Sequence, residues 1–286
     1  MTYVLFNPLA DNKQGESNSQ KLKELLVGKN PEFKDITKND YPDFIKGLSA
    51  DDEVVVAGGD GTLNRFANAM YDAGVDFATL KPQILYYPCG SGNDFMRDVQ
   101  DYAVNGIVAI KDFLKDLPKV TVNGKTSRFI NGIGYGIEGY CCEVGDEFRK
   151  KSDKPVNYAG IAIKGVLFHF KPRNAKVIID GKTYLYKKVW LAPSMNGCYM
   201  GGGMKIAPEQ ERTGKDRTLS CVIWFGSGRL KTLMVFPSIF KGEHVTHKDM
   251  IAVHEGKKIT VEFDKPCALQ IDGETVLNVS SYTAEL

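Results

Sequence analysis

The chain has 286 residues, of which 43% are hydrophobic and 25% are charged, and its formal net charge is +2. This length suits one large domain or two ordinary ones, and we expect two. The balanced charge argues against strong nucleic-acid binding, and no apolar run approaches the ~18 residues of a membrane-spanning helix. The N-terminus lacks a signal-peptide pattern and the cysteines lack a metal-binding spacing, so we expect a cytoplasmic protein with reduced thiols.

The first third of the chain alternates short apolar runs with helical patterns. We expect strands at residues 3–6, 33–37, 53–57 and 84–87, a polar loop at 10–18, and helices at 22–27 and 41–48. This alternation is typical of an α/β domain with a parallel sheet. In such an open sheet, the loops that follow the carboxyl ends of the strands form the ligand crevice. The residues just after the predicted strands are therefore the first candidates for a site.

The loop after the third predicted strand is rich in glycine and reads Gly58-Gly59-Asp60-Gly61-Thr62. Apolar residues follow at i, i+3, i+4 and i+7, which predicts a helix from Leu63 to Met70. Glycines let the backbone approach a ligand, Thr62 can cap the helix, and a helix N-terminus suits a phosphate. Asp60 would repel a bare phosphate, so it makes sense mainly if Mg²⁺, water or a protonated donor lies between them. A strand-to-helix turn without a ligand explains this loop equally well.

A second glycine loop, Gly90-Ser91-Gly92-Asn93-Asp94, follows the fourth predicted strand. Because strand ends of a parallel sheet share one edge, both loops and Asn7-Pro8 are expected to line the same crevice. Ser91 and Asn93 offer polar side chains there, and Asp94 offers a second carboxylate beside Asp60. Two such loops favour a nucleotide site over an empty turn.

Beyond residue 115 the pattern changes to strands joined by hairpin turns. Type I′ dipeptides occur at Asn123-Gly124, Asp180-Gly181 and Asp272-Gly273, each between strand-like runs. Helical stretches at 137–150, 157–170 and 229–240 interrupt this sheet. We therefore predict an α/β domain at 1–118 and a β-rich antiparallel domain at 119–286, whose last residues could return to the first domain.

Both glycine loops match a known family. Gly58–Thr62 together with residues 90–97 resembles the catalytic domain of the diacylglycerol kinase and sphingosine kinase superfamily, especially its soluble bacterial lipid kinases. The first loop is also shared with NAD kinases and phosphofructokinases, whereas the second loop is particular to the lipid kinases. The likeness covers nearly the whole chain. It includes Asn7-Pro8, residues 129–136, Gly201-Gly202-Gly203 with Ala207-Pro208, and Asp272-Gly273-Glu274.

The resemblance implies two domains that bind ATP in the cleft between them, and transfer of the γ-phosphoryl group to the hydroxyl of a lipid such as diacylglycerol. It implies a nucleotide site formed by Asn7, Gly58, Gly59, Asp60, Gly61, Thr62, Gly90, Ser91, Asn93 and Asp94. Asp60 and Asp94 are expected in a network of Mg²⁺ and water. Asp272 is expected to be the general base, with Glu274 assisting.

Two positions limit this interpretation. The family usually has Asp-Gly at a structural Mg²⁺ site, but this chain has Asp216-Arg217, which puts that metal site in doubt. In addition, Asp-Gly is the ordinary dipeptide of a type I′ hairpin, so only the resemblance separates Asp272 from the plain turn expected at Asp180.

Residues 134–139 also match GxGxxG, but no second parallel strand follows, which argues against a dinucleotide site.

Other functions and partners remain open on the sequence. An NAD-kinase-like enzyme with a soluble acceptor and a nucleotide-binding regulator without turnover are the alternatives. Residues 149–176 are basic and partly amphipathic, which fits either contact with an anionic membrane or a helix packed on the sheet with a solvated face. We expect peripheral contact at the inner membrane face, and monomer and homodimer are both open.

Overall fold

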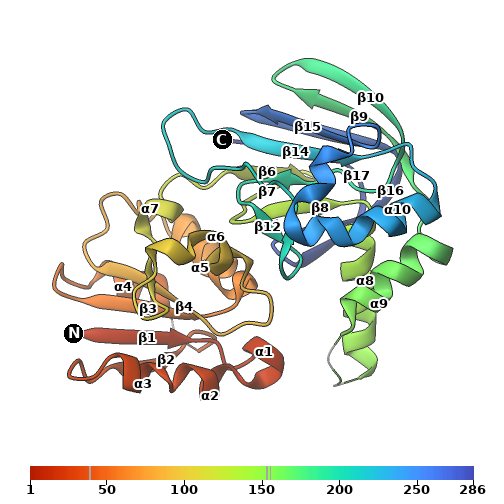
Figure 1. Ribbon diagram of the computed structural model, residues 1–286. Helices are drawn as coiled ribbons and strands as arrows, with labels where there is room; N and C mark the ends of the chain where they lie inside the picture. Colours follow the sequence, from red (N-terminus) through yellow and green to blue (C-terminus); the bar gives the residue numbers. More distant parts are fainter. Residues whose placement is uncertain (39, 153, 155) are drawn as a thin grey trace. The chain divides into compact units, whose positions relative to one another are not determined.

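The computed structural model describes residues 1–38, 40–152, 154 and 156–286. Within them the chain forms two compact units, Met1–Leu117 and Pro118–Leu286 (Figure 1). The first unit has a five-stranded sheet with helices, and the second has a ten-stranded sheet with its own core. The predicted fold class, an α/β unit followed by a β-rich antiparallel unit, is confirmed.

The sheet of the first unit has the order β2-β1-β3-β4-β5. Its parallel strands are β2 (Glu32–Asp35), β1 (Thr2–Phe6), β3 (Glu53–Gly58) and β4 (Gln83–Pro88), and β5 (Val108–Ala109) pairs antiparallel with β4. Val54, Val55 and Val56 in the central strand β3 are fully buried. A strand covered on both faces reads as a continuous apolar run, which explains this valine triplet.

The helices of this unit are short except for one. They are α1 (Ala10–Lys13), α2 (Gly15–Ser19), α3 (Leu22–Leu25), α4 (Tyr41–Lys46), α5 (Asp60–Asp72), α6 (Asp94–Val99), a 3₁₀ turn (Gln100–Tyr102) and α7 (Lys111–Leu114). The longest, α5, buries Leu63, Phe66, Ala67 and Met70 completely, as their spacing predicts. Burial of this face fixes the start of α5 at the end of β3.

The segment after β1 differs from the prediction. The predicted loop at 10–18 contains α1 and α2, and the helix predicted at 22–27 ends at Leu25. A side chain at Gly15 would lie only 1.9 Å from the carbonyl oxygen of Asn7, so α2 packs directly on the backbone beyond β1. This contact with a distant backbone has no signal in the local polar pattern. Val27 lies beside Gly28, where φ of +86° turns the chain, and is exposed.

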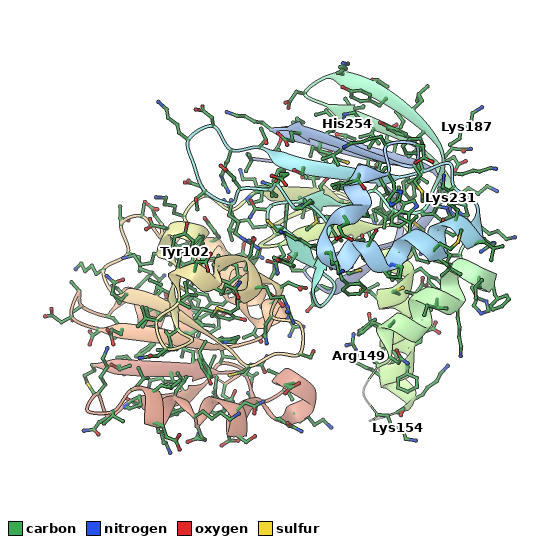
Figure 2. All side chains as sticks on the ribbon, in the orientation of Figure 1. Tyr102, Arg149, Lys154, Lys187, Lys231 and His254 are labelled. Carbon is green, nitrogen blue, oxygen red and sulfur yellow. The ribbon has the colours of Figure 1, made fainter. Side chains whose placement is uncertain are left out.

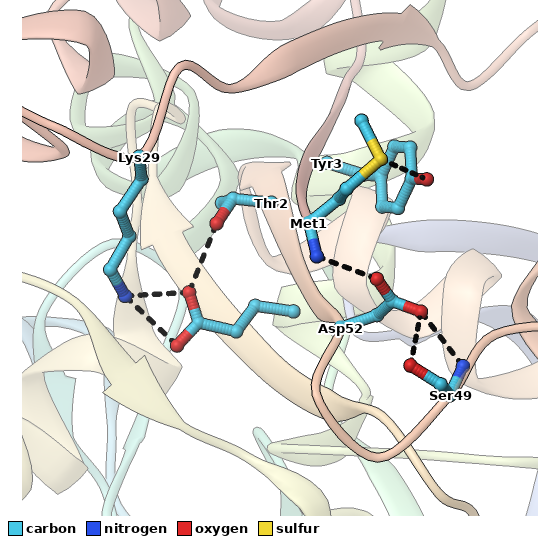
Figure 3. A network of polar contacts seen from close by, with 7 residues as sticks. Met1, Thr2, Tyr3, Lys29, Ser49 and Asp52 are labelled. Atoms are coloured by element: carbon cyan, nitrogen blue, oxygen red, sulfur yellow. Dashed lines mark hydrogen bonds and ion pairs between the residues drawn. The ribbon is translucent and has the colours of Figure 1, made fainter.

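Polar contacts join the amino ends of β1 and β3 (Figure 3). The Asp52 carboxylate accepts hydrogen bonds from the Met1 ammonium group at 2.6 Å and from the Ser49 backbone and hydroxyl at 2.8 Å each. These hydrogen bonds lower the pKa of Asp52 to about 2, and the bond from the ammonium group has the largest effect. Lys29 contacts the Glu53 carboxylate at 2.6 Å. These contacts lie at the end of the sheet opposite to the glycine loops.

The second unit is built on an antiparallel sheet whose main order is β15-β14-β11-β8-β16-β17-β6-β7, with β9 paired to both β10 and β16. The strands are β6 (Lys119–Val122), β7 (Lys125–Arg128), β8 (Gly132–Tyr135), β9 (Arg173–Ile179), β10 (Lys182–Val189), β11 (Ser194–Met195), β14 (Leu219–Trp224), β15 (Ile251–Gly256), β16 (Lys258–Ile271) and β17 (Glu274–Glu285). The short strands β12 (Tyr199–Met200) and β13 (Met204–Lys205) form a separate pair. All three predicted hairpin turns have positive φ at both central residues, as type I′ requires.

The long strand β16 connects two parts of this sheet. Its first half pairs with β9 and its second half with β8, while β17 runs along both halves across an irregular register. Residues 282–285 at the end of β17 also pair with β6. Residues 282–285 therefore belong to the sheet of the second unit.

Helices cover part of the second unit. They are α8 (Ile137–Lys151), α9 (Tyr158–Lys164), the π-helical turn η2 (Gly165–His169), α10 (Arg229–Val235), and the 3₁₀ turns η3 (Phe236–Lys241) and η4 (Glu243–Thr246) (Figure 1). The strand before α8, β8, has antiparallel neighbours on both sides, so the GxGxxG match is not a βαβ unit. A side chain at Gly139 would lie 2.0 Å from the Ala268 carbonyl oxygen, so this glycine allows α8 to pack on β16.

Candidate active site

The first unit brings together the residues at the carboxyl ends of β1, β3 and β4, which are neighbours in the sheet. Asn7 is buried at the end of β1, and its Nδ2 donates a hydrogen bond to Thr62 Oγ1 at 2.8 Å. Its backbone N–H donates to the Ala57 carbonyl at 3.2 Å. The Asn7 loop is thereby fixed to the first turn of α5.

The two glycine loops touch without any side chain between them. A Cβ atom on Gly90 would lie 2.4 Å from Cα of Gly59, and one on Gly59 would lie 3.0 Å from Cα of Gly90. Similarly, a Cβ atom on Gly58 would lie 2.5 Å from the side chain of Thr62. A Cβ atom on Gly58 or Gly90 would overlap these neighbours, and the glycines at 59 and 90 let the two loop backbones pack directly on each other.

Asp60 bridges the two loops. Its Oδ2 accepts a hydrogen bond from the backbone N–H of Asp94 at 3.0 Å, and its Oδ1 accepts one from Phe95 at 2.8 Å. A carboxylate on the first N–H groups of a helix is stabilised by those groups and by the helix dipole. Asp60 therefore anchors the start of α6, a structural reason for an acid in a glycine loop that the sequence did not reveal.

The second loop is also fixed internally. Asn93 adopts the left-handed conformation, with φ of +53°. Its side chain accepts from Gly90 N at 3.1 Å and donates to Gly90 O at 2.7 Å. Ser91 is exposed, whereas Asp94 is buried. The buried Tyr86 hydroxyl donates to the Gly58 carbonyl of the first loop at 2.9 Å. Burial raises the pKa of Tyr86, and the negative charge of Asp60 raises it further.

In the second unit, Asp272 occupies the first central position of the turn between β16 and β17, and its side chain is buried. Its carboxylate accepts three backbone hydrogen bonds, from Ile130 at 2.5 Å, Asn131 at 2.8 Å and Gly132 at 3.1 Å. This contact joins two segments that are about 140 residues apart in the chain. Asp180, at the matching position of the β9–β10 turn, is exposed and accepts from the backbone N–H groups of Lys257 and Lys258.

Further polar side chains bind residues 130 and 131. Arg212 is buried and donates to the Ile130 carbonyl at 2.6 Å and to Asn131 Oδ1 at 2.5 Å. Asn196 donates to the same Ile130 carbonyl at 2.8 Å, and Arg217 donates to Asn196 Oδ1 at 3.1 Å and to the Arg212 carbonyl at 2.6 Å. The sequence reasoning missed Arg212 and Asn196, since neither lies in a recognisable motif.

The residues around Asp216 do not fit a structural Mg²⁺ ion. Asp216 is exposed, and the next residue, Arg217, donates to Asn196 Oδ1 and to the Arg212 carbonyl. The positive charge of Arg217 beside Asp216 would repel a divalent cation. Across the described residues, no group of three or more His, Cys, Asp or Glu side chains could hold a metal ion.

Glu138, in the first turn of α8, is a buried acid that the sequence did not single out as a site residue. Neither of its carboxyl oxygens has a hydrogen-bond partner among the described residues. Burial raises the pKa of Glu138 to about 8. A protonated carboxyl is therefore the form that this site favours near neutral pH. The exposed Glu274 follows the Asp272 turn, and Thr275 donates to Asp146 of the same helix α8 at 2.6 Å.

The two units match two described families. Residues 1–123 match the family described as "Diacylglycerol kinase catalytic domain", and residues 131–284, more than half of the chain, match "YegS C-terminal NAD kinase beta sandwich-like domain". Among the helices that the structure describes, none combines the length and the apolar content needed to cross a membrane.

The similarity to known proteins covers most of the chain. YtlR of Bacillus subtilis is 23% identical over 299 residues, covering 95% of this chain and 92% of YtlR. The diacylglycerol kinase of Mycobacterium tuberculosis H37Rv is 26% identical over 219 residues, covering 74% of this chain and 67% of that protein. A crystal structure of a diacylglycerol kinase from Bacillus anthracis covers 99% of this chain and 93% of its own, with 21% identity and a TM-score of 0.62. At this identity the last comparison shows a shared fold.

The contact between Gly59 and Gly90 predicts that Gly90→Ala destabilises the first unit. The added methyl group would overlap backbone atoms, so we expect a loss of about 1–3 kcal/mol in the free energy of unfolding, measured with urea. Gly47→Ala is the matched control, because its Cβ atom would lie at ordinary contact distances of 3.5 and 3.7 Å. Equal stability of the Gly90→Ala variant and the parent would contradict this account of the loops.

The burial of Glu138 predicts a pH-dependent stability. Between pH 4.5, its ordinary pKa, and about 8, the folded state holds this proton more tightly than the unfolded state. The free energy of unfolding should therefore fall as pH rises through this window, by up to about 1.4 kcal/mol per pH unit from this group.

Glu138→Gln removes the titration, so its stability relative to the parent should increase between pH 5 and pH 8, as urea unfolding at both values would measure. Glu147→Gln, at an exposed position on the same helix, is the control for the loss of a carboxyl group from α8. Parallel pH profiles for Glu138→Gln and the parent would show that the buried carboxyl is not protonated.

Proposed function

The chain belongs to the diacylglycerol kinase-like family of lipid kinases, and from this membership we propose that it transfers the γ-phosphoryl group of ATP to the hydroxyl group of a lipid such as diacylglycerol. The observation that carries the proposal is the Asp272 carboxylate, which is buried and held by three backbone N–H groups. These bonds fix the orientation of the carboxylate, and a fixed position relative to the acceptor hydroxyl is the first requirement of a general base.

The glycine loops of the first unit support ATP as the phosphoryl donor. The first turn of α5, a helix of 13 residues, offers backbone N–H groups, and the glycines keep side chains away from them. We assign the contacts with the nucleotide to Asn7, Gly58, Gly59, Gly61, Thr62, Gly90, Ser91 and Asn93. The links from Asn7 to Thr62 and from Asp60 to α6 hold these residues in position before any ligand arrives.

We propose that Asp60 and Asp94 contact a magnesium ion that comes with the nucleotide. In kinases Mg²⁺ is commonly held by one or two carboxylates together with the phosphates, and a cage of three protein acids is not needed. When bound, this ion neutralises charge on the phosphates. Asp60 keeps the loop that carries Asp94 in place, which makes it a positioning residue as well as a candidate ligand.

The reaction then follows the general scheme of phosphoryl transfer. The acceptor hydroxyl gives its proton to Asp272, and its oxygen forms a bond to the γ-phosphorus as the bond to the bridging oxygen of ADP breaks. Asn131 and Gly132 keep the Asp272 carboxylate oriented, and Arg212 in turn holds Asn131. Glu274 lies two residues further along the same turn and is proposed to assist this step.

A panel of acceptors tests the activity. We expect ADP release with Mg²⁺-ATP and vesicles that contain diacylglycerol, phosphatidylglycerol, a monoacylglycerol or a sphingoid base, and formation of the matching phospholipid. NAD offered without vesicles distinguishes a kinase for a soluble dinucleotide. Turnover of NAD alone would overturn the lipid assignment, and tight ATP binding without transfer to any acceptor would indicate a regulator.

The role of Asp272 predicts that Asp272→Asn lowers kcat by about 10²-fold or more while ATP binding to the first unit persists. The new amide also meets backbone N–H donors, so some stability should be lost together with activity. Asp180→Asn is the matched control, because Asp180 starts the same type of turn and accepts backbone hydrogen bonds from residues 257–258. The control should keep full kcat. Unchanged kcat in folded Asp272→Asn would remove this residue from the mechanism.

A further inference from the structure

Two neighbouring segments of the second unit expose large apolar side chains. Phe168 of η2 is 71% exposed, and Leu230 and Met234 of α10 are 72% and 75% exposed. The segments are packed on each other, and the Arg229 guanidinium on α10 donates to the Val166 carbonyl of η2. We call this region, together with the end of α9, the α9–α10 surface and define it by Ile163, Lys164, Phe168, Leu230, Lys231 and Met234.

Helix α9 contributes to this surface in an unusual way. It contains Ile161 and Ile163 but has no buried residue. Within residues 149–176, Val166 and Phe170 pack into the core of the unit, whereas α9 contacts α8 and η2. On α10, Leu230 and Met234 lie one turn apart, on the face opposite to the buried Thr232 and Val235.

The charges around this surface are mainly positive. Exposed lysines at positions 164, 171, 231 and 241 accompany the apolar side chains, and Figure 2 labels Lys231 on α10. The acidic residues on the same elements and directly after them are Glu243 and Asp249, and Asp249 forms an ion pair with Lys231. Residues 158–172 contain two lysines and no acid. With Lys231 paired to Asp249, the exposed residues Lys164, Lys171 and Lys241 still outnumber Glu243, so these elements carry a positive charge.

We propose that the α9–α10 surface is the face by which this protein rests on an anionic lipid bilayer. Apolar side chains beside lysines are the arrangement that binds at a membrane interface, where the chains enter the acyl boundary and the lysines contact the head groups. A protein partner would have to complement both the exposed apolar tips and the lysines, whereas an anionic bilayer offers both features at every point. The inference depends on the proposed function in one respect, because a lipid acceptor gives the protein a reason to reach the bilayer.

Vesicle sedimentation tests this surface without any need for activity. We expect the protein to sediment with vesicles of phosphatidylcholine and phosphatidylglycerol, to do so much less with phosphatidylcholine alone, and to be released by salt. The triple variant Phe168→Ser, Leu230→Ser, Met234→Ser should lower the partition coefficient about tenfold or more. All three side chains are exposed, so the fold should persist, which circular dichroism would check.

Two exposed apolar residues elsewhere provide matched controls. Leu185 on β10 is 78% exposed and Val27 is 82% exposed, and serine at either position should leave sedimentation unchanged. Equal binding by the triple variant and the parent, or equal binding of the parent to neutral and anionic vesicles, would overturn the proposal. A change from dimer to monomer in the triple variant, seen by analytical ultracentrifugation without vesicles, would assign the surface to a second copy instead.

A kinase assay separates this inference from the proposed function. With a diacylglycerol acceptor in detergent micelles, the triple variant should keep the parent's kcat, while its rate on anionic vesicles should fall in proportion to binding. If the parent turns over no lipid but still sediments as described, the proposed activity fails and the membrane surface stands. If turnover on vesicles survives the triple substitution, the membrane surface fails and the activity stands.

Discussion

The second unit depends on one buried interaction, the binding of the Asp272 carboxylate by the backbone N–H groups of Ile130, Asn131 and Gly132. A buried carboxylate is costly unless hydrogen bonds satisfy it, and three donors meet this requirement. The contact also fixes the end of β16 against the start of β8, strands far apart in the chain. The proposed catalytic group and the geometry of the sheet around it are thus maintained by the same bonds.

The first unit uses the same physical device. Asp60 accepts the first N–H groups of α6 and so joins two loops, as Asp272 joins two strands. In both cases the sequence predicts a binding or catalytic role for an acid, and the same acid also links two backbone segments. Removing either acid would leave buried or capped N–H groups without their acceptor, so effects on folding and on chemistry must be measured separately at these positions.

The sequence predicted the elements whose patterns are local. The valine strand, the spacing from Leu63 to Met70 and the three Asn-Gly or Asp-Gly turns specify their structures through neighbouring residues alone. The loops and the Asp272 turn were also found, because a family motif marks them. What could not be predicted rests on distant segments: Gly15 lies on the Asn7 carbonyl, Arg212 donates to Asn131, and Glu138 is buried with no hydrogen-bond partner among the described residues. Residues 10–18 were predicted to be a polar loop for the same reason, because their packing on a distant backbone segment leaves no local signal.

The contact of Gly59 with Gly90 also determines how the first unit can move. Since no side chain separates the two backbones, there is no flexible atom group that could yield when one loop is displaced. With Asp60 bound to the second loop from the first, the two glycine loops form one mechanical body. A displacement of either loop at these contacts must therefore move the other loop as well.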